Sequence, residues 1–489
     1  MRLYHSTRDE SRKAAADEAI LQGLAPDGGL YVPESFPKLD LAALSELDAH
    51  ALFARVLSAL LDDYSDEEML AIVRAGYAGR FSADDVTPLV EAGGVSMLEL
   101  FHGPTCAFKD VALSLLPRLI TRAARRLGVT DEVRVLTATS GDTGKAALAG
   151  FADVPGTSIV VFYPFGGVSE VQRLQMVTQA GENVRVCAVN GNFDDAQTGV
   201  KRIFADTDLN ARLSARGLRL SSANSINLGR LAPQIAYYFK AYLDLVRAGT
   251  IQIGDKLNFS VPTGNFGDIL AGDYARRMGL PVGTLICASN ENNVLADFIR
   301  TGVYDRRRAF RKTASPSMDI LVSSNLERCL YHMGGDAALV RRMMSDLCGK
   351  GFFEAPESLM ENMRAVFAAG WADDAAALTA IQKLYREAGY LMDTHTAVGR
   401  RVAEDYVRET GDRRPMVVLA TASPFKFAQD VLRAITGEQL PGFPALDRLS
   451  EVCGLPVPRP LATLRDQKEI HADVVDASDM ARCVEEAFA

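Results

Sequence analysis

The sequence has no excess of basic residues, and this absence narrows the classes of protein to which it can belong. Its 489 residues include 53 lysines and arginines against 62 aspartates and glutamates, a net charge of −9 at pH 7. Proteins that hold nucleic acid or anionic lipid by counterion release need a basic surface. We therefore expect neither a nucleic-acid nor a membrane partner, and an anionic small molecule would need local basic groups.

Long apolar runs and paired cysteines are missing as well. No run reaches the roughly 18 apolar residues of a membrane helix, and the first residues lack the apolar core of a secretory signal. The seven cysteines are scattered, without a Cys-x-x-Cys pair, which argues against a metal site or a disulfide framework. We expect a cytoplasmic protein with reduced core thiols and no metal.

The composition is that of a large globular protein. Hydrophobic residues make up 48% and charged residues 24%, close to the averages of globular domains. At about 150 residues per domain the length predicts about three domains. The first 95 residues look mostly helical, with a turn cluster at 26–33 and one apolar stripe at helical spacing. The stripe consists of Leu52, Phe53, Val56, Leu57 and Leu60.

From about residue 110, short apolar runs alternate with helical patterns. The runs span residues 133–138, 157–163, 184–189, 257–262, 284–289 and 416–421. Such runs suit strands buried on both faces of a parallel sheet. Helical patterns at 111–128 and 269–279 each end at a glycine, and the proline-rich stretch 441–460 predicts a surface connection. The sequence thus predicts an α/β fold with parallel sheets, in which ligands bind beyond the carboxyl ends of strands.

Two of these runs are followed by loops suited to an anion. Residues 139–146 fail the Walker A spacing, since Thr139 replaces the first glycine and Ala146 the magnesium-binding hydroxyl. This excludes a P-loop ATPase, but a loop of small hydroxylated residues before a helix still suits a carboxylate or phosphate. Residues 263–268, Thr-Gly-Asn-Phe-Gly-Asp, form a second such loop. Taken alone, tight turns and helix caps remain the alternative for both.

Two further segments carry groups for covalent chemistry and for phosphate. Lys109 stands at the expected start of a helix, where desolvation and the helix N-terminus would both lower the pKa of its amine. Such a lysine is suited to form a Schiff base, and a solvated surface lysine is the alternative. Residues 224–230 place three small polar side chains and Arg230 at another helix start. The guanidinium fits phosphate oxygens, with helix capping as the alternative.

Together these motifs resemble the threonine synthases, pyridoxal-phosphate (PLP) enzymes of the tryptophan-synthase β-subunit fold type. The resemblance runs nearly end to end, through DGGLYVPE, ELFHGPTCAFKD, ATSGDTGKAAL, NSINLGRLAPQIAYYF, VPTGNFGD, SPSMDILVSSNLER, DTHTAVG and LATASPFKF. It implies two parallel-sheet α/β domains of PLP fold type II with the cofactor between them, plus a mainly helical N-terminal domain. The expected domains are 1–95, 96–250 with the cofactor lysine, and 251–489 with the cofactor-phosphate loop; the boundaries are approximate, because the chain can cross between the α/β domains.

The resemblance also implies roles for individual residues. Lys109 matches the lysine that binds the cofactor covalently and shuttles protons, Phe108 the residue beside the pyridine ring, and Thr421 the hydroxyl facing the pyridine nitrogen. The cofactor phosphate would be held by Gly264, Asn265, Phe266, Gly267 and Asp268. The substrate carboxylate would be received by Ser140, Gly141, Asp142 and Thr143, and the substrate phosphate by Asn224, Ser225 and Arg230. Lys145 and Asn227 are less certain additions.

The implied activity is the conversion of O-phospho-L-homoserine and water to L-threonine and phosphate, the last step of threonine biosynthesis. We expect a monomeric lyase, with a dimer as the alternative. The rival hypotheses are a PLP-dependent serine or threonine dehydratase and a non-catalytic phosphate-binding descendant of the fold. Arg230 with Asn224 and Ser225 argues against the dehydratase, which has no substrate phosphate to hold, and Lys109 with Thr421 argues against the binding protein.

Two positions depart from the family pattern. Asp142 stands where related dehydratases and sulfhydrylases carry asparagine, and an ionised carboxylate there would repel the cofactor phenolate and the substrate carboxylate. We expect Asp142 to brace its loop through Lys145 instead. The family segment THPAKF is represented by residues 421–427, Thr-Ala-Ser-Pro-Phe-Lys-Phe. The histidine of THPAKF has no counterpart in these residues, so any role it has in the family is absent here.

Overall fold

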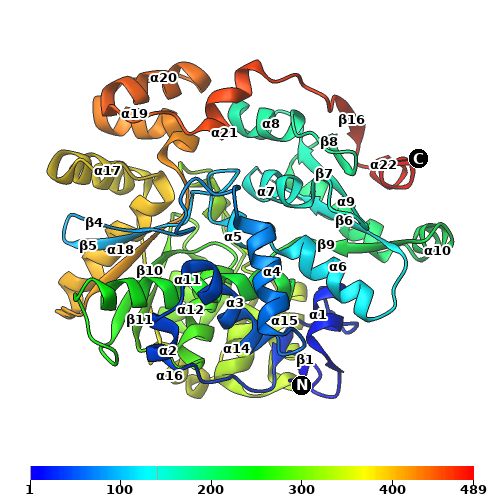
Figure 1. Ribbon diagram of the computed structural model, residues 1–489, viewed down its shortest axis with the longest axis horizontal. Coiled ribbons are helices and arrows are strands. Elements are labelled where there is room, and N and C mark those ends of the chain that lie inside the picture. Colours follow the sequence, from blue (N-terminus) through cyan, green and yellow to red (C-terminus); the bar gives the residue numbers. More distant parts are fainter. Residues whose placement is uncertain (1, 140, 489) are drawn as a thin grey trace.

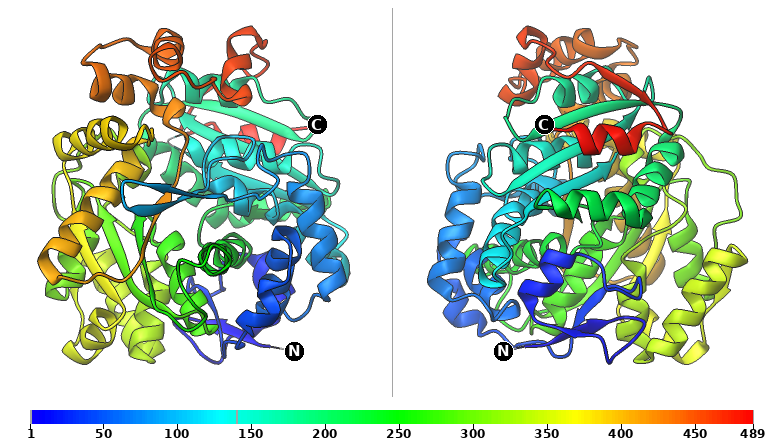
Figure 2. Two further views of the ribbon diagram at one scale, coloured as in Figure 1. Left: turned by 60° about the vertical axis from the view of Figure 1, so that its left-hand side comes forward. Right: turned by 90° about the vertical axis from the view of Figure 1, so that its right-hand side faces the viewer.

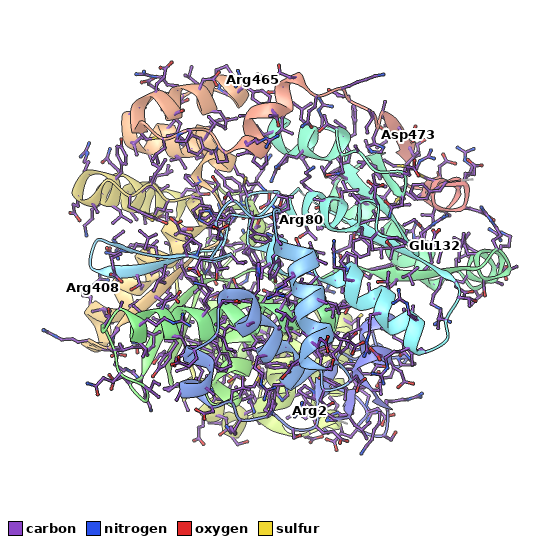
Figure 3. All side chains as sticks on the ribbon, in the orientation of Figure 1. Arg2, Arg80, Glu132, Arg408, Arg465 and Asp473 are labelled. Carbon is purple, nitrogen blue, oxygen red and sulfur yellow. The ribbon has the colours of Figure 1, made fainter. Side chains whose placement is uncertain are left out.

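The computed structural model describes residues 2–139 and 141–488, without the side chain of residue 194. Two large sheets dominate the structure, one on the left and one on the right of Figure 1. Within the described residues no helix is both long and apolar enough to span a membrane. In Figure 3, the charged side chains of Arg408, Arg465 and Asp473 lie near the outer edge of the molecule.

The larger sheet contains the three strands predicted after residue 250. Its order is β14 (Phe367–Trp371), β11 (Val282–Ser289), β10 (Leu257–Pro262), β15 (Met416–Ala420), β5 (Val95–Glu99) and β4 (Leu89–Ala92). All neighbouring strands are parallel except β4 and β5. Helices α12 (Gly267–Arg277), α13 (Val294–Thr301) and α18 (Thr394–Thr410) pack on this sheet. The strands predicted at 257–262, 284–289 and 416–421 are confirmed, the last ending one residue earlier.

The smaller sheet is parallel throughout, and its central strands are buried on both faces. Its order is β16 (Asp473–Asp476), β8 (Val184–Asn190), β7 (Thr157–Pro164), β6 (Glu132–Ala138) and β9 (Leu218–Ser222). Val133 and Ile159 belong to the core that includes α7 (Asp142–Phe151). Val160 and Phe162 belong to a second core with α9 (Phe193–Ala205), α10 (Thr207–Ala215) and α22 (Met480–Glu486). Successive side chains point to opposite faces, so the unbroken apolar runs confirm the predicted doubly buried strands.

The N-terminal unit combines a small antiparallel sheet with helices. The sheet order is β2 (Lys13–Ala14), β1 (Tyr4–Ser6) and β3 (Tyr31–Pro33), and the helices are α1 (Ala16–Gln22), α2 (Leu41–Ser45), α3 (Ala49–Leu60) and α4 (Asp66–Tyr77). The predicted apolar stripe lies on α3 and is buried. It packs against α11 (Leu228–Arg247), a nearly wholly buried helix that also contacts α12. One continuous hydrophobic core therefore joins this unit to both sheets.

The chain passes between the two sheets more than once. β4 and β5 belong to the larger sheet, although the strands that follow them, β6 to β9, build the smaller one. After β15 the chain runs through η2 (Pro424–Phe427), α19 (Ala428–Thr436), α20 (Gly442–Cys453), α21 (Arg459–Ala462) and η3 (Thr463–Asp466). It then returns to the smaller sheet as β16 and α22, drawn in red in Figures 1 and 2. The boundaries at residues 95 and 250 stay a prediction.

Prolines overturn two local predictions. The helix expected at 111–128 is divided into α5 (Lys109–Leu113) and α6 (Leu116–Arg126). Pro117 lacks an N–H and would clash with the preceding turn inside one long helix, whereas it fits the first turn of α6. Conversely, the surface connection expected at 441–460 contains α20. Pro444 lies in the first turn of α20, where backbone N–H groups have no intrahelical partner, so it does not prevent the helix.

The remaining elements extend the two α/β units. They are α8 (Glu170–Val177), β12 (Val303–Asp305), η1 (Pro316–Met318), α14 (Leu326–Gly334), α15 (Ala337–Gly349), β13 (Phe352–Glu354), α16 (Glu357–Arg364) and α17 (Asp374–Ala388). Of these, η1 matters most for the site, because it lies against the loop that follows β10. The carbonyl oxygen of Ser317 would be 2.6 Å from a Cβ atom on Gly264.

Candidate active site

The residues predicted for the site follow the carboxyl ends of strands in both sheets. Lys109 lies beyond β5, the 139–143 loop follows β6, the 263–268 loop follows β10, and Thr421 follows β15. Ser140, predicted to bind the substrate carboxylate, lies outside the described residues. In open parallel sheets this edge is where ligands bind.

Lys109 is the first residue of α5, and its side chain is buried. Its Nζ lies 3.4 Å from Ser317 Oγ, 3.8 Å from Asp142 Oδ2 and 4.5 Å from the centre of the Phe108 ring. Burial, opposed by the charge of Asp142, lowers the pKa of Lys109 to about 8. A lysine with this pKa has a larger neutral, nucleophilic fraction near physiological pH than an exposed one.

The loop that carries Lys109 is docked on the end of β15. Phe108 N donates to Thr421 O at 2.8 Å, and Ser423 N donates to Cys106 O at 3.0 Å. Between these bonds, Ala107 and Ala422 form an isolated antiparallel bridge. Thr421 is buried and begins the segment that receives the lysine loop. The two predicted cofactor residues are thus held together by backbone hydrogen bonds.

Asp142 begins α7 and is held by a residue that the sequence did not indicate. Its Oδ1 forms a 2.8 Å ion pair with Lys426 Nζ and accepts a hydrogen bond from Gln172 Nε2 at 3.1 Å. Burial raises the pKa of Asp142, but the charges of Lys426 and Lys109 outweigh it, and the pKa lies well below its ordinary value. The carboxylate is therefore ionised in the folded protein.

The predicted brace between Asp142 and Lys145 is wrong. Lys145 lies on α7 with Asp142, but its Nζ donates to Gln179 Oε1 at 2.6 Å, just beyond α8. Gly141 caps α7 at a φ of 145°, and a Cβ atom on it would lie 2.5 Å from the Gln172 amide nitrogen, so this position requires glycine. Thr143 is half-buried in the first turn of α7.

The loop after β10 turns sharply into α12. Phe266 precedes the helix in the left-handed conformation, at a φ of 61°, and its buried ring packs against Phe367. Asn265 O accepts a hydrogen bond from Asn325 N at 3.0 Å. Gly264 is closely covered by η1, as described above. The first N–H groups of α12 lack intrahelical partners, so this turn can bind a phosphate.

Asp268 belongs to the same loop, but its side chain is turned towards α11. Its Oδ1 accepts hydrogen bonds from the hydroxyl groups of Tyr237 and, at 3.3 Å, Tyr238. Burial raises the pKa of Asp268 to about 7, although the tyrosine hydroxyls act in the opposite direction. The side chain ties α12 to α11, which leaves only the backbone of Asp268 for a phosphate.

Arg230 is a buried cation without an ion-pair partner among the described residues. Its Nη1 donates to Ala223 O at 2.5 Å, whereas its Nε has no hydrogen-bond partner in the described part of the chain. Burial lowers the pKa of Arg230 to about 10. A buried guanidinium is unfavourable unless it is paired, so this position favours an anionic ligand. Of the other two predicted phosphate ligands, Asn224 is half-buried and Ser225 Oγ lies 3.3 Å from Ser324 Oγ.

Asn227, the less certain addition to this group, has a structural role. Its Oδ1 accepts from Gly229 N at 2.8 Å and caps α11, while its Nδ2 donates to Ile20 O at 2.9 Å. Both ends of the amide are therefore engaged. The residue fixes the start of α11 against the N-terminal unit.

Besides Lys426, three residues of the site were not assigned by sequence reasoning. Ser317 Oγ contacts Lys109, as given above, and donates to Asp142 Oδ2 at 3.3 Å. Ser317 N donates to His395 Nε2 at 3.1 Å, and His395 Nδ1 lies 2.8 Å from Asp393 Oδ1. Because the backbone N–H occupies Nε2, Nδ1 carries the ring proton. The residues lie within the SPSMD and DTHTAVG motifs, but no local pattern indicates that these motifs meet.

The third such residue, Asn325, presents a buried donor to the start of α12. Its Oδ1 accepts from Arg328 Nη1 at 2.5 Å, and its Nδ2 has no partner among the residues that the structure describes. That nitrogen would lie 3.3 Å from a Cβ atom on Gly267. The site therefore combines an amine of lowered pKa, a helix N-terminus with a free amide donor, and a hydroxyl-bearing residue beyond β15. These groups fit the aldehyde, the phosphate and the ring nitrogen of PLP, respectively.

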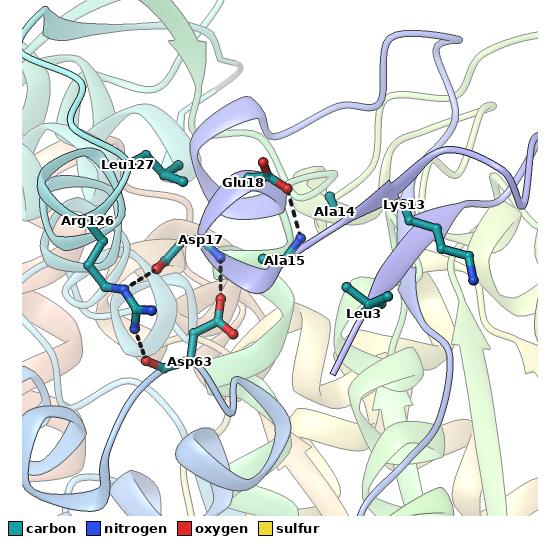
Figure 4. A pocket seen from close by; sticks show the side chains of 9 residues that line it. All are labelled: Leu3, Lys13, Ala14, Ala15, Asp17, Glu18, Asp63, Arg126 and Leu127. Atoms are coloured by element: carbon teal, nitrogen blue, oxygen red, sulfur yellow. Dashed lines mark hydrogen bonds and ion pairs between the residues drawn. The ribbon is translucent and has the colours of Figure 1, made fainter. Parts of the chain in front are cut away.

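One cavity of about 330 Å³ lies elsewhere, between the N-terminal unit and the end of α6 (Figure 4). It is lined by Leu3, Lys13, Ala14, Ala15, Asp17, Glu18, Asp63, Arg126 and Leu127. Arg126 is engaged within this lining: its Nε lies 3.3 Å from Asp17 Oδ2, and the residue also donates to the backbone carbonyl oxygen of Asp63. The cavity shares no residue with the predicted site.

Comparison with known proteins agrees with this geometry. Family models match in chain order: Threonine synthase N terminus at residues 3–77, Pyridoxal-phosphate dependent enzyme at 82–422, and Threonine synthase, C-terminal at 396–483. Threonine synthase of Pseudomonas aeruginosa is 40% identical over 448 residues, which cover 90% of this chain and 92% of that protein.

Two further relatives extend the comparison. Human Threonine synthase-like 1 is 40% identical over 434 residues and matches 86% of this chain, but the chain spans only 58% of that protein's length. The crystal structure of PLP-bound threonine synthase from Brucella melitensis superposes with a TM-score of 0.88 at 37% identity, covering 100% of this chain and 99% of that one. The chain belongs to the threonine synthase family of pyridoxal-phosphate-dependent enzymes.

Proposed function

We propose that this chain converts O-phospho-L-homoserine and water to L-threonine and phosphate. The observation that carries the proposal is Arg230, a buried guanidinium without a carboxylate partner among the described residues. It lies close enough to Lys109 for its charge to lower the pKa of that amine. A substrate that bears both an amino-acid group and a phosphate would account for a buried cation that acts on the lysine.

The cofactor of the family, PLP, is held in this proposal by groups from both sheets. Lys109 binds its aldehyde covalently, Phe108 lies beside its ring, and Thr421 faces its ring nitrogen. The backbone of residues 264–268 and the Asn325 amide hold its phosphate. When bound, PLP withdraws electrons from the α-carbon of an amino acid, which makes the loss of a proton there feasible.

Different residues of the chain bind the substrate carboxylate, move its protons and bind its phosphate. Backbone N–H groups of residues 141–143, at the start of α7, receive the substrate carboxylate. Lys109 would move protons at Cα and Cβ of the substrate, for which a pKa of about 8 is well matched. Arg230, with Asn224 and Ser225, binds the phosphate and stabilises its charge as it leaves Cγ.

The serine or threonine dehydratase remains the principal rival within this fold. It would need the lysine and the cofactor loop but no cation for a substrate phosphate, so Arg230 would stand buried without a ligand. A non-catalytic descendant would need the phosphate site but no buried amine of lowered pKa. A monomer in the cytoplasm stays a prediction for this chain.

The proposal is tested by measuring threonine and phosphate release from O-phospho-L-homoserine, and ketoacid release from serine. Arg230→Ala should lower kcat/KM for O-phospho-L-homoserine roughly 30- to 1000-fold, as expected when a buried charge-assisted pair loses one partner. Serine dehydration should remain as slow as before, because serine has no phosphate. Arg247→Ala, at the exposed end of the same helix, should leave both rates unchanged.

Two outcomes would contradict the proposal. Wild-type protein that dehydrates serine faster than it forms threonine would favour the dehydratase. An equal loss on both substrates in Arg230→Ala would show that Arg230 supports the fold or the cofactor instead.

A further inference from the structure

Lys426 is a second buried lysine beside Lys109, and nothing in its sequence context indicates a role. Its side chain is fully buried, and its Nζ lies 2.8 Å from Asp142 Oδ1. The other carboxylate oxygen of Asp142 lies 3.8 Å from Lys109 Nζ. One carboxylate therefore stands between two lysine amines, closer to Lys426 than to Lys109.

The position of Lys426 is fixed by the segment that also holds the Lys109 loop. Lys426 lies in η2, whose first turn is capped by Ser423: its Oγ accepts a hydrogen bond from Phe425 N at 3.3 Å. Ser423 N in turn donates to Cys106 O. Lys109 and Lys426 are thus carried by two segments that are bonded to each other, and α7 brings Asp142 between them.

We propose that Lys426 is a positioning residue that holds the Asp142 carboxylate in the closer ion pair, at 2.8 Å, and so keeps its ion pair with Lys109 long, at 3.8 Å. In this arrangement Lys426 balances the charge of Asp142, and Lys109 remains available as a neutral amine. The ion pair also removes the repulsion that an uncompensated carboxylate would exert on an anionic cofactor and substrate. This inference rests on the proposed function, in which Lys109 binds the cofactor.

Charged groups from several elements act on Lys109, and their signs set the expected effect. They are Asp142 on α7, Lys426 in η2, Arg230 on α11, Asp268 on α12 and, on its own helix, Asp110. His395 on α18 is a further titratable group that faces Asp142. Removing Lys426 takes away a positive neighbour and frees Asp142 to pair with Lys109. Both changes favour the charged amine, so the pH needed to deprotonate Lys109 rises.

Asp142 and Lys426 should therefore behave as one unit. With asparagine at 142 no counter-charge is needed, because the amide is neutral. In Asp142→Asn alone, the unpaired charge of Lys426 should make Lys109 easier to deprotonate. In the double variant Asp142→Asn/Lys426→Met, both charges are gone and the amine should return towards wild-type behaviour.

The experiment follows covalent capture of PLP by the full-length chain from which cofactor has been removed, between pH 6 and pH 10. Absorbance above roughly 400 nm reports the covalent species, and borohydride trapping with mass mapping identifies the lysine. The midpoint pH of capture should rise by about one unit or more in Lys426→Met, the size of a close charge effect. It should stay near the wild-type value in Lys426→Arg, which keeps the positive charge.

Lys240→Met is the matched control, because Lys240 is also buried and ion-paired, at 2.6 Å to Asp85 and Asp244, but lies outside the site. It should leave the midpoint unchanged. Equal midpoints for Lys426→Met and Lys240→Met, with Lys109 trapped in both, would overturn the inference and leave the proposed function intact. Trapping at a lysine other than Lys109 would overturn the proposed function instead.

A second comparison serves if Lys426→Met does not fold. Asp142→Asn and the double variant carry no unpaired buried carboxylate, and they differ only at Lys426. The single variant should capture the cofactor at lower pH than the double variant. Identical midpoints would show that the charge of Lys426 does not act on Lys109.

Discussion

Two lysines with similarly lowered pKa values differ in the groups around their amines. Burial lowers the pKa of both Lys109 and Lys145 to about 8. Lys145 donates to Gln179 beyond α8, whereas Lys109 lies beside Phe108, Ser317 and Asp142. The pKa values alone do not distinguish the two lysines. The assignment of Lys109 as the cofactor lysine therefore depends on where its amine lies, beside Phe108, Ser317 and Asp142.

Borohydride reduction of the cofactor-loaded chain, followed by peptide mapping, should therefore label Lys109 and not Lys145. Lys109→Ala should abolish the absorbance band of the covalent species and essentially all turnover, since no second amine occupies its place. Lys145→Ala should keep the band. A label on Lys145 would contradict the assignment.

Asp268 predicts a measurable dependence of stability on pH. Burial raises the pKa of Asp268 to about 7 in the folded chain, above its value of about 4 when unfolded. The stability contributed by its protonated form is complete below about pH 4 and is lost as pH rises to about 7. Asp268→Asn removes this loss, so its melting temperature relative to wild type should be higher at pH 8 than at pH 5.

The size of the effect should be on the order of a few kcal/mol at pH 8. Asp273→Asn offers a control on the same helix, because buried Asp273 pairs with Arg276 and Arg277. It should lower the melting temperature at both pH values. A pH-independent difference for Asp268→Asn would show that Asp268 ionises normally in the folded chain.

At the scale of elements, the start of α12 depends on how closely η1 covers it. A Cβ atom on Gly264 would lie 2.6 Å from Ser317 O, a backbone atom that cannot rotate away. Gly264→Ala should therefore displace η1, and with it the Ser317 hydroxyl that contacts Lys109. We expect cofactor affinity to fall at least tenfold, about 1.4 kcal/mol, within the range for overpacking.

Spectrophotometric titration with PLP measures this loss directly. Gly349→Ala serves as the control, since a Cβ atom there meets nothing within 4 Å and alanine is the better helix former. Its cofactor affinity should equal that of wild type. Unchanged affinity in Gly264→Ala would mean that η1 moves freely without affecting the site.

At the scale of the whole molecule, Arg328 joins three parts of the chain that are distant in sequence. This fully buried residue of α14 donates from Nε to Tyr31 O at 2.9 Å and from Nη2 to Ile226 O at 2.5 Å. Its Nη1 donates to Asn325 Oδ1, as described above. It therefore links the N-terminal unit, the segment before α11 and the free amide at the start of α12.

Arg328→Met should loosen all three connections at once. Two carbonyl oxygens would lose a charged donor, which predicts a destabilisation of roughly 2–5 kcal/mol, a lower melting temperature and earlier proteolysis of residues 1–80. Thermal denaturation and limited proteolysis measure these effects, and Arg341→Met on the exposed face of α15 should show neither. If Arg328→Met melted like wild type, the N-terminal unit would be held by its hydrophobic contacts alone.

The sequence by itself predicted six strands of the two large sheets, the loops that follow them and most of the residues that make up the candidate site. Apolar runs such as 157–163 and 257–262 are local patterns, and burial on both faces is a property of each run, so their positions could be predicted without knowing their neighbours. The same holds for Lys109 at a helix start and for the 263–268 loop before α12. Proline can either interrupt a helix or stand in its first turn. The predicted elements around Pro117 and Pro444 were wrong because the sequence does not show which of the two applies.

Only the tertiary structure decided which groups face one another. The partner of Asp142 is Lys426 and not Lys145. Lys426 lies in η2, which is distant in sequence from α7 but packs close to it in the folded chain. Asp268 turns to two tyrosines of α11, and Arg230 stays without a counter-ion in the described chain. A sequence pattern shows which face of an element is buried. Which element covers that face depends on long-range packing, and so do the charges and pKa values of the site.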